Sequence, residues 1–249
     1  MKNVQQVLVA LALVLALAGL IGAIISGFGT RLGLWEFGSG FSVLKWSVYA
    51  AIAGVVLALA GAVLAVPAGA RLLDTRLLAA AIVGLAVFGI TYSFAHQFKK
   101  TPTVADASTN IEDPPVFVAL IPVRVETAKN PLAYRRDEAA DLQQRYFPDL
   151  TEVVEFDQPP AEVIRLAATV AEEMGFEIID VAPREGRLEA TDTTFWYGFK
   201  DDIVVRARPQ ADGKTRVDVR SASRVGYLDG GLNARRIQEF LQKLAAEMN

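Results

Sequence analysis

The chain has 249 residues, of which 52% are hydrophobic, and a formal net charge of −3. It contains no cysteine and one histidine, which excludes disulfides, thiolate metal sites and cysteine nucleophiles and argues against a histidine-dependent triad. The charge is uneven, because residues 1–98 carry five basic and two acidic side chains (+3) and residues 99–249 carry twenty basic and twenty-six acidic ones (−6). An acidic soluble half argues against nucleic acid as a partner.

Three apolar stretches without Asp, Glu, Lys or Arg cover residues 4–25, 46–66 and 77–98. Each has about 20 residues, and at about 1.5 Å per residue each is long enough to cross a hydrocarbon core of roughly 30 Å. We therefore predict a three-helix transmembrane region over residues 1–98. The first stretch also resembles a signal peptide, but its 22 residues exceed the usual apolar run of about 7–15, which favours a retained helix.

The orientation is predicted from the connections, because Lys and Arg counts barely differ between the two sides. Residues 67–76 form a short connection with Arg71 and Arg76, which is typical of a cytoplasmic loop. Aromatic residues mark the opposite interface: Trp35, Phe37, Phe41, Trp46, Tyr49, Tyr92, Phe94 and Phe98. We expect a cytoplasmic N-terminus, with residues 99–249 outside the membrane.

Small residues recur every four positions in the second apolar stretch, at Ala50, Gly54, Ala58 and Ala62. This spacing lets helices approach closely. Two interpretations stay open, namely packing within the three-helix region and docking of another membrane protein.

Residues 99–133 are expected to form an extended linker, because five prolines in this segment oppose a long helix. The apolar residues Phe117, Val118, Leu120 and Ile121 predict that the linker packs on the following domain. Its acidic residues match no calcium-loop spacing, so we predict no metal site.

The remaining residues, 134–249, predict a soluble α+β domain. Strands are expected over residues 151–156, 176–182, 187–194, 203–208 and 215–224, and helices over residues 160–174 and 232–247. This order predicts an antiparallel sheet covered by two helices on one face, similar to helix-grip folds.

Charges alternate along the last strand, with Arg216, Asp218, Arg220 and Arg224 on one face. A three-residue loop over residues 211–213 would place Arg206 opposite Asp218 and Val204 opposite Arg220. This register leaves Arg206 and Arg220 on one face, so it needs a bulge or twist before Arg220 or a mixed neighbour. A two-residue turn would instead place Arg206 opposite Val219. The simplest interpretation is a solvated sheet face with cross-strand ion pairs.

The stretch that follows suggests an anion site, because Arg235 and Arg236 begin a helix whose free N–H groups also attract anions. The alternative is a closed structural network in which Asp201, Asp202 and Asp229 compensate the arginines. Asp201 and Asp202 are adjacent on a strand, so they point to opposite faces and do not form a catalytic carboxylate pair. The candidate anion-binding or structural residues are Asp201, Asp202, Arg220, Ser221, Ser223, Arg224, Asp229, Asn233 and Arg236.

An aromatic turn, Phe195-Trp196-Tyr197-Gly198-Phe199, precedes Lys200. Such a turn is costly if exposed to water, so we expect it to cap the sheet core or to contact the membrane or a ligand.

Several short motifs resemble an uncharacterised bacterial family known as DUF1499. They are Gly-Phe-Lys-Asp-Asp (198–202), Arg-Ser-Ala-Ser-Arg-Val-Gly (220–226), Asp-Gly-Gly-Leu-Asn-Ala-Arg-Arg-Ile (229–237), Glu-Asp-Pro-Pro (112–115) and Gly-Leu-Trp-Glu-Phe (33–37). The resemblance implies an envelope protein whose soluble domain lies outside the inner membrane, and it implies no activity.

From these features we expect a multi-pass protein of the bacterial inner membrane with a periplasmic domain and no cofactor, metal or catalytic residue. The lipid bilayer is its expected partner, together with another membrane protein or an amphipathic ligand. Whether the chain is an enzyme is left open, although the missing His and Cys chemistry favours a non-catalytic binding or assembly module. The alternative is a hydrolase or transferase acting on an anionic envelope substrate.

Overall fold

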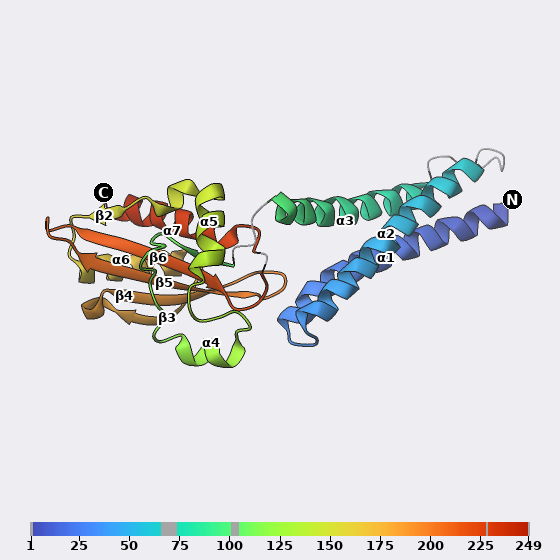
Figure 1. Cartoon of the computed structure of the whole chain (residues 1–249). Coiled ribbons are helices and arrows are strands. Elements are labelled where there is room, and N and C mark those ends of the chain that lie inside the picture. Colours follow the sequence, from blue (N-terminus) through green and yellow to red (C-terminus); the bar gives the residue numbers. More distant parts are fainter. Residues whose placement is uncertain (1, 66–73, 101–104, 228, 249) are drawn as a thin grey trace. The chain divides into compact units, whose positions relative to one another are not determined.

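The computed structural model describes residues 2–65, 74–100, 105–227 and 229–248. It divides into two compact units, which are described separately (Figure 1). Unit 1 comprises residues 1–96 with Phe195–Gly198, and unit 2 comprises the remaining residues. Residues 67–73 of the expected short connection lie outside the described residues.

Unit 1 contains α1 (Lys2–Arg31), α2 (Phe37–Ala65) and α3 (Thr75–Lys100) up to residue 96. All three are long and apolar enough to cross a membrane, as predicted from the sequence. Close packing of α1 on α2 depends on glycine, since a Cβ on Gly19 would lie 2.7 Å from the Ser47 carbonyl oxygen and one on Gly54 would lie 2.9 Å from that of Ala12. Gly54 and Ala58 of the small-residue series are therefore buried within this unit.

The aromatic turn Phe195–Gly198 belongs to unit 1. The Trp196 indole N–H donates to the Ile24 carbonyl at 3.2 Å, and the Tyr197 hydroxyl lies 3.3 Å from the Ser26 hydroxyl. Tyr197 is buried here, so the interpretation of this turn as a cap on the sheet core is wrong. The sequence alone does not indicate that this turn packs against α1.

Unit 2 is built on an antiparallel sheet with the strand order β1-β6-β5-β4-β3 (Figure 1). Strand β2 also pairs with β6, along a different part of that strand from the part that pairs with β1. The strands are β1 (Asp106–Ser108), β2 (Val154–Phe156), β3 (Glu177–Ala182), β4 (Arg187–Thr193), β5 (Lys200–Pro209) and β6 (Thr215–Ser223). The helices are α4 (Ile121–Thr127), α5 (Arg136–Tyr146), α6 (Pro160–Glu173) and α7 (Leu232–Met248), with short 3-10 turns at Pro148–Thr151 and Pro183–Glu185.

Helices α6 and α7 cover one face of the sheet, as predicted. Helix α6 begins at Pro160, which is favourable in a first turn, and the chain leaves it through Gly175, whose φ of +79° suits glycine. The core between helices and sheet is filled by apolar side chains that include Val170, Val205, Val219, Ile237 and Phe240.

The other face of the sheet is covered by the chain segment that precedes α5, which we call the covering segment (residues 105–135). Phe117 and Leu120 of this segment are buried against Val204 and Ala222, so the proline-rich stretch packs on the domain. The interpretation of this sheet face as solvated is wrong, because Asp202, Asp218 and Arg220 are at most 1% exposed. The alternation of charged and apolar residues along the strand is as predicted, but a single sequence does not show which segment covers a charged face.

The pairing of β5 with β6 follows the register of the three-residue loop. Arg206 lies opposite Asp218 and Val204 lies opposite Arg220. No bulge interrupts the ladder from Asp201–Ser223 to Pro209–Thr215, and of the expected alternatives the structure has the mixed neighbour, since the apolar Val204 lies opposite Arg220. Arg206 and Arg220 can lie on the same face of the sheet because each has its own carboxylate partner. Asp218 binds Arg206 at 2.7 Å, and Asp106 binds Arg220 at 2.7 Å.

Candidate functional site

The nine candidate residues do not form one site, because alternation along β5 and β6 distributes them over both faces of the sheet. Asp202, Arg220 and Arg224 lie beneath the covering segment, whereas Asp201 pairs with α7 on the opposite face. The prediction that Asp201 and Asp202 do not converge is confirmed by their separate partners.

The first group is the outer-face cluster, defined as Asp106, Arg124, Asp202, Arg220 and Arg224. Asp202 is fully buried and binds two guanidinium groups, Arg124 at 2.7 Å and Arg224 at 2.8 Å. The Thr191 hydroxyl also donates to Asp202, at 2.8 Å. Arg220 is held separately, with its Nε and Nη2 atoms donating to the two carboxylate oxygens of Asp106 at 2.9 and 2.7 Å.

The aromatic ring of Phe117 contacts two of these arginines. The guanidinium carbons of Arg124 and Arg220 lie 4.9 and 5.0 Å from the centroid of Phe117. Cation–π contact of this kind stabilises a buried guanidinium next to an aromatic face. Phe117 therefore links the apolar and charged parts of the covering segment.

The second group is the helix-face cluster, which joins α7 to the sheet. Arg236 is its centre and pairs with Asp192 and Asp201, each at 2.7 Å. Asn233 accepts from the Ser221 hydroxyl at 2.6 Å and donates to the Ser223 hydroxyl at 3.0 Å. The members of the cluster are Asp192, Asp201, Ser221, Ser223, Asn233 and Arg236.

Among the described residues no arginine pairs with Asp229, which instead caps α7. Its two carboxylate oxygens accept from the backbone N–H groups of Gly231 and Asn233 at 2.8 and 2.9 Å. Burial raises the pKa of Asp229, and these hydrogen bonds oppose the shift. The free N–H groups that suggested an anion site are thus partly occupied by the chain itself.

Two further charged groups lie under the covering segment. Asp218 binds Arg206, Arg208 and Arg216 at 2.7, 3.0 and 2.9 Å. Glu189 accepts from three consecutive backbone N–H groups, those of Val118, Ala119 and Leu120, at 2.8 to 3.1 Å. Glu189 thereby fixes the start of α4.

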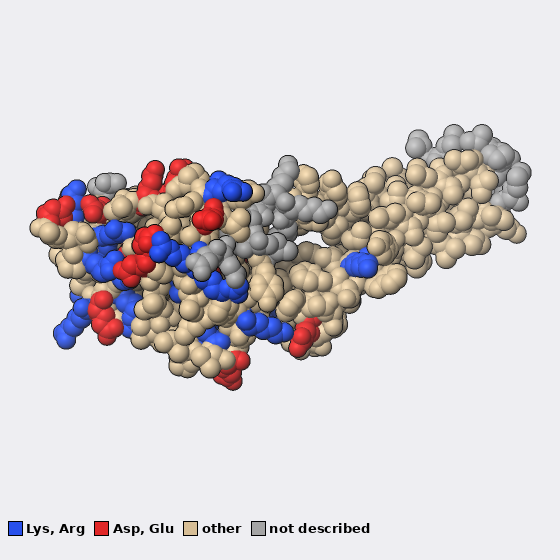
Figure 2. Space-filling model, viewed as in Figure 1, with Lys and Arg blue, Asp and Glu red and all other residues tan. Residues whose placement is uncertain are grey.

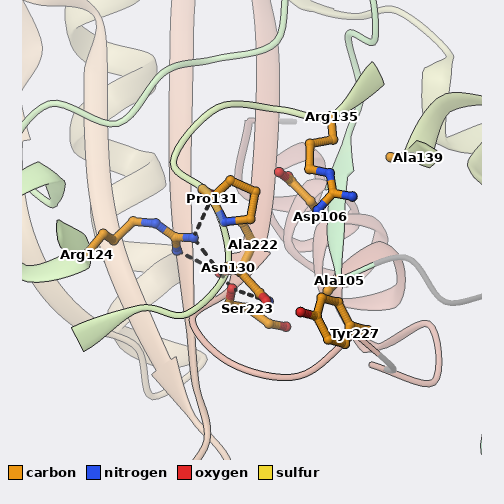
Figure 3. A pocket seen from close by; sticks show the side chains of 10 residues that line it. All are labelled: Ala105, Asp106, Arg124, Asn130, Pro131, Arg135, Ala139, Ala222, Ser223 and Tyr227. Carbon is orange, nitrogen blue, oxygen red and sulfur yellow. Dashed lines mark hydrogen bonds between the residues drawn. The ribbon is translucent and has the colours of Figure 1, made fainter. Parts of the chain in front are cut away.

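A small pocket of about 70 Å³ opens beside the outer-face cluster (Figure 3). Its polar walls come from separate elements and include Arg124 on α4, Asp106 on β1, and Arg135 before α5. The full lining is Ala105, Asp106, Arg124, Asn130, Pro131, Arg135, Ala139, Ala222, Ser223 and Tyr227. Of these, only Ser223 was a candidate from the sequence.

Two opposing effects act on the pKa of the Asp106 carboxyl. Desolvation by burial raises its pKa above the ordinary 3.8, while the hydrogen bonds and charge of Arg220 lower it, and the net direction is upward.

Sequence reasoning missed Arg124, Asp106, Glu189 and Asp192 as members of the buried groups. Arg124 is surrounded by apolar residues in Ile-Pro-Val-Arg-Val, and a charge inside such a run was the available signal that its side chain is specifically held. Among the described side chains, no group of three or more His, Cys, Asp or Glu is arranged to hold a metal ion.

A comparison with protein families places this domain. Residues 106–244 match the model described as Protein of unknown function (DUF1499). The chain belongs to the DUF1499 family. The matched region begins at the first residue of β1 and ends within α7, so it covers the sheet, both polar clusters and all of the pocket lining except Ala105. No curated protein matches the chain.

Proposed function

We propose that this DUF1499 protein is an integral protein of the bacterial inner membrane whose α+β domain is a non-catalytic binding or assembly module in the periplasm. The N-terminus would then lie in the cytoplasm. The lipid bilayer would be its constant partner, and the domain would engage another membrane protein or an amphipathic ligand.

The anchor is supported by the composition of the two units. The spans of α1, α2 and α3 have mean hydropathies of 2.9, 2.4 and 2.1. In the view of Figure 2, the lysines, arginines and acidic residues gather on unit 2, and the helices are almost devoid of them. A surface of this kind is stable in lipid and costly in water.

The non-catalytic role rests on one observation, the mutual engagement of the candidate polar residues. Every one of the nine predicted residues donates to or accepts from another group of the chain, as in the Asp202–Arg224 and Asp201–Arg236 pairs. A general base or nucleophile needs access to substrate within hydrogen-bond reach. The carboxylates of Asp201 and Asp202, at 4% and 0% exposure and already bound to arginines, are suited to fixing the fold.

The arrangement of α7 over the sheet supports a helix-grip-like classification as part of the proposal. Its interior differs from a ligand-holding grip, because Ile237, Phe240 and Leu244 fill the space below α7. Ligand binding is therefore expected on the covering-segment side of unit 2 or at the surface.

The topology can be tested by cysteine labelling, since the natural chain provides a cysteine-free background. Single variants Leu34→Cys and Ala211→Cys should react with a membrane-impermeant maleimide in intact spheroplasts. The matched variants Asn3→Cys and Thr75→Cys should react only after the membrane is permeabilised. The opposite labelling pattern would overturn the proposed orientation.

The binding role can be tested by native mass spectrometry of the full chain extracted in mild detergent. A retained lipid, small molecule or stoichiometric protein partner is the expected result. A bare protein under several extraction conditions, together with hydrolysis of an envelope ester by the natural chain, would replace the module by the enzyme alternative.

A further inference from the structure

We propose that the aromatic turn Phe195–Gly198 lies in the interface between lipid headgroups and acyl chains, where it gives the DUF1499 domain a membrane contact of its own. The inference rests on the proposed membrane anchor and names the bilayer interface as the partner of one further surface. Three features of the turn support it, namely its position along α1, its aromatic neighbours and the exposed apolar side chains around it.

The turn packs on the part of α1 where the apolar sequence ends. The apolar run of this helix ends at Ile25, and the next charged residue is Arg31. The Trp196 indole N–H donates to the Ile24 carbonyl at 3.2 Å. The Phe195 carbonyl accepts from Arg31 at 2.6 Å. These contacts cover roughly 10 Å of the helix axis, which is comparable with the roughly 5–8 Å that one headgroup layer adds to the hydrocarbon core.

A glycine of α1 makes room for the turn. A Cβ on Gly27 would collide with the indole ring of Trp196, so a larger residue at this position would displace the turn. Gly198 completes the fit, because its φ of +68° favours glycine and a Cβ there would lie 2.9 Å from the Cγ of Arg31. The end of α1 is therefore shaped to hold this turn.

Each aromatic residue of the turn contacts an aromatic ring on a different helix of unit 1. The ring centroids are 5.5 Å apart for Phe195 and Phe28 of α1, 4.9 Å for Tyr197 and Phe41 of α2, and 6.5 Å for Trp196 and Phe94 of α3. Phe41 and Phe94 belong to the aromatic residues that the sequence predicts at one membrane interface. The turn thus adds three rings to this predicted interface, from a part of the chain that follows the end of α3 by about 95 residues.

Apolar side chains are exposed around the turn. Phe195 is 77% exposed, and Leu32 and Leu34, which follow α1, are 73% and 69% exposed. Such a surface is costly in water, whereas the headgroup region accommodates apolar side chains together with the amphipathic rings of Trp and Tyr. The bilayer interface can therefore cover this surface without a protein partner.

The test is fluorescence quenching of the full chain in phosphatidylcholine vesicles. Trp35→Phe combined with Trp46→Phe leaves Trp196 as the only indole, because the chain has three tryptophans. The reference variant, Trp35→Phe combined with Trp196→Phe, keeps Trp46, which lies on α2 and is 69% exposed. Lipids brominated near the ester group quench indoles at the interface, and lipids brominated near the methyl end quench indoles at the bilayer centre.

We expect Trp196 to lose more fluorescence with the shallow bromines than with the deep ones, and to lose little with aqueous iodide. Quenching of Trp196 by iodide and not by brominated lipid, while lipid quenches Trp46, would overturn the inference and leave the membrane anchor intact. If lipid quenches neither tryptophan, the proposed anchor fails, and the interfacial turn fails with it.

A second measurement keeps all the tryptophans. A polarity-sensitive fluorophore on Phe195→Cys should report apolar surroundings, and the same label on the matched Ala211→Cys, in the turn beyond the other end of β5, should report water. Water-like emission at both positions contradicts the inference. Adding Gly27→Val should shift the emission at position 195 toward that of water, because valine displaces Trp196. Gly89→Val, on α3 with nothing within 4 Å of an added Cβ, should leave the emission unchanged, and equal shifts would overturn the role of α1 in holding the turn.

Discussion

Asp202→Asn is expected to be the most damaging small change in unit 2. The Asp202 carboxylate is fully buried and receives charge-assisted hydrogen bonds from Arg124 at 2.7 Å and from Arg224 at 2.8 Å. Asparagine keeps the shape but removes the charge, which leaves two buried guanidinium groups without a counter-ion. Breaking a buried ion pair costs about 3–5 kcal/mol, and we expect a loss of this size in the free energy of opening of the sheet.

Hydrogen–deuterium exchange with mass spectrometry suits this measurement, because peptides from β5 and β6 report on unit 2 in the intact, detergent-solubilised chain. Asp141→Asn, an exposed aspartate on α5, is the matched control and should change protection by less than about 0.5 kcal/mol. Adding Arg124→Gln to Asp202→Asn should cost less than the sum of the single changes, since it removes one unpaired cation. A stability of Asp202→Asn within about 1 kcal/mol of the natural chain would refute the assigned charge balance.

Three further predictions concern single carboxyl groups. Burial raises the folded-state pKa of Asp106 above 3.8, so the protonated carboxyl contributes to the stability of the fold below pH 3.8. This contribution is lost as the pH rises through the folded pKa. Denaturation profiles of Asp106→Asn, measured over the same pH range, should lack this decline. Asp229→Ala should cost about 1 kcal/mol and speed amide exchange in the first turn of α7, whereas an unaltered first turn would contradict its capping role. Glu189→Gln should lower the local free energy of opening around α4 by about 1–3 kcal/mol, seen as faster proteolysis of the covering segment, and unchanged cleavage would count against the Glu189 clamp.

The elements that the sequence predicted are those with strong periodicity. The apolar stretches became α1, α2 and α3, and the alternating strands appear as β3, β4, β5 and β6 with the register that places Arg206 opposite Asp218. Helix α5 was missed because Arg-Asp-Glu-Ala-Ala-Asp-Leu-Gln-Gln-Arg-Tyr has few apolar residues to mark a face. Strand β1 has only three residues, too few for alternation to be recognised.

The sequence predicted several residues of the site but not the residues with which they pair. The arginines and aspartates of β5 and β6 were predicted to form either an anion site or a closed network. The partners of Asp202 and Arg220, Arg124 and Asp106, lie 78 and 114 residues away along the chain. Asp229 illustrates the same limit, since an acidic residue before a helix is as compatible with a cap as with an arginine pair. Only the packing of the covering segment on the sheet distinguishes these possibilities.

The pairing of β1 with β6 sets an order of events during synthesis. Asp106 follows the last apolar helix closely in sequence, yet its partner Arg220 is 114 residues further along the chain. The first strand of the domain therefore has no partner until more than a hundred further residues have been made, and contacts of such long range form slowly. Until then, Phe117 lacks the strands β5 and β6 against which it is buried in the finished domain, and its contact with the arginine of α4 has no sheet beneath it.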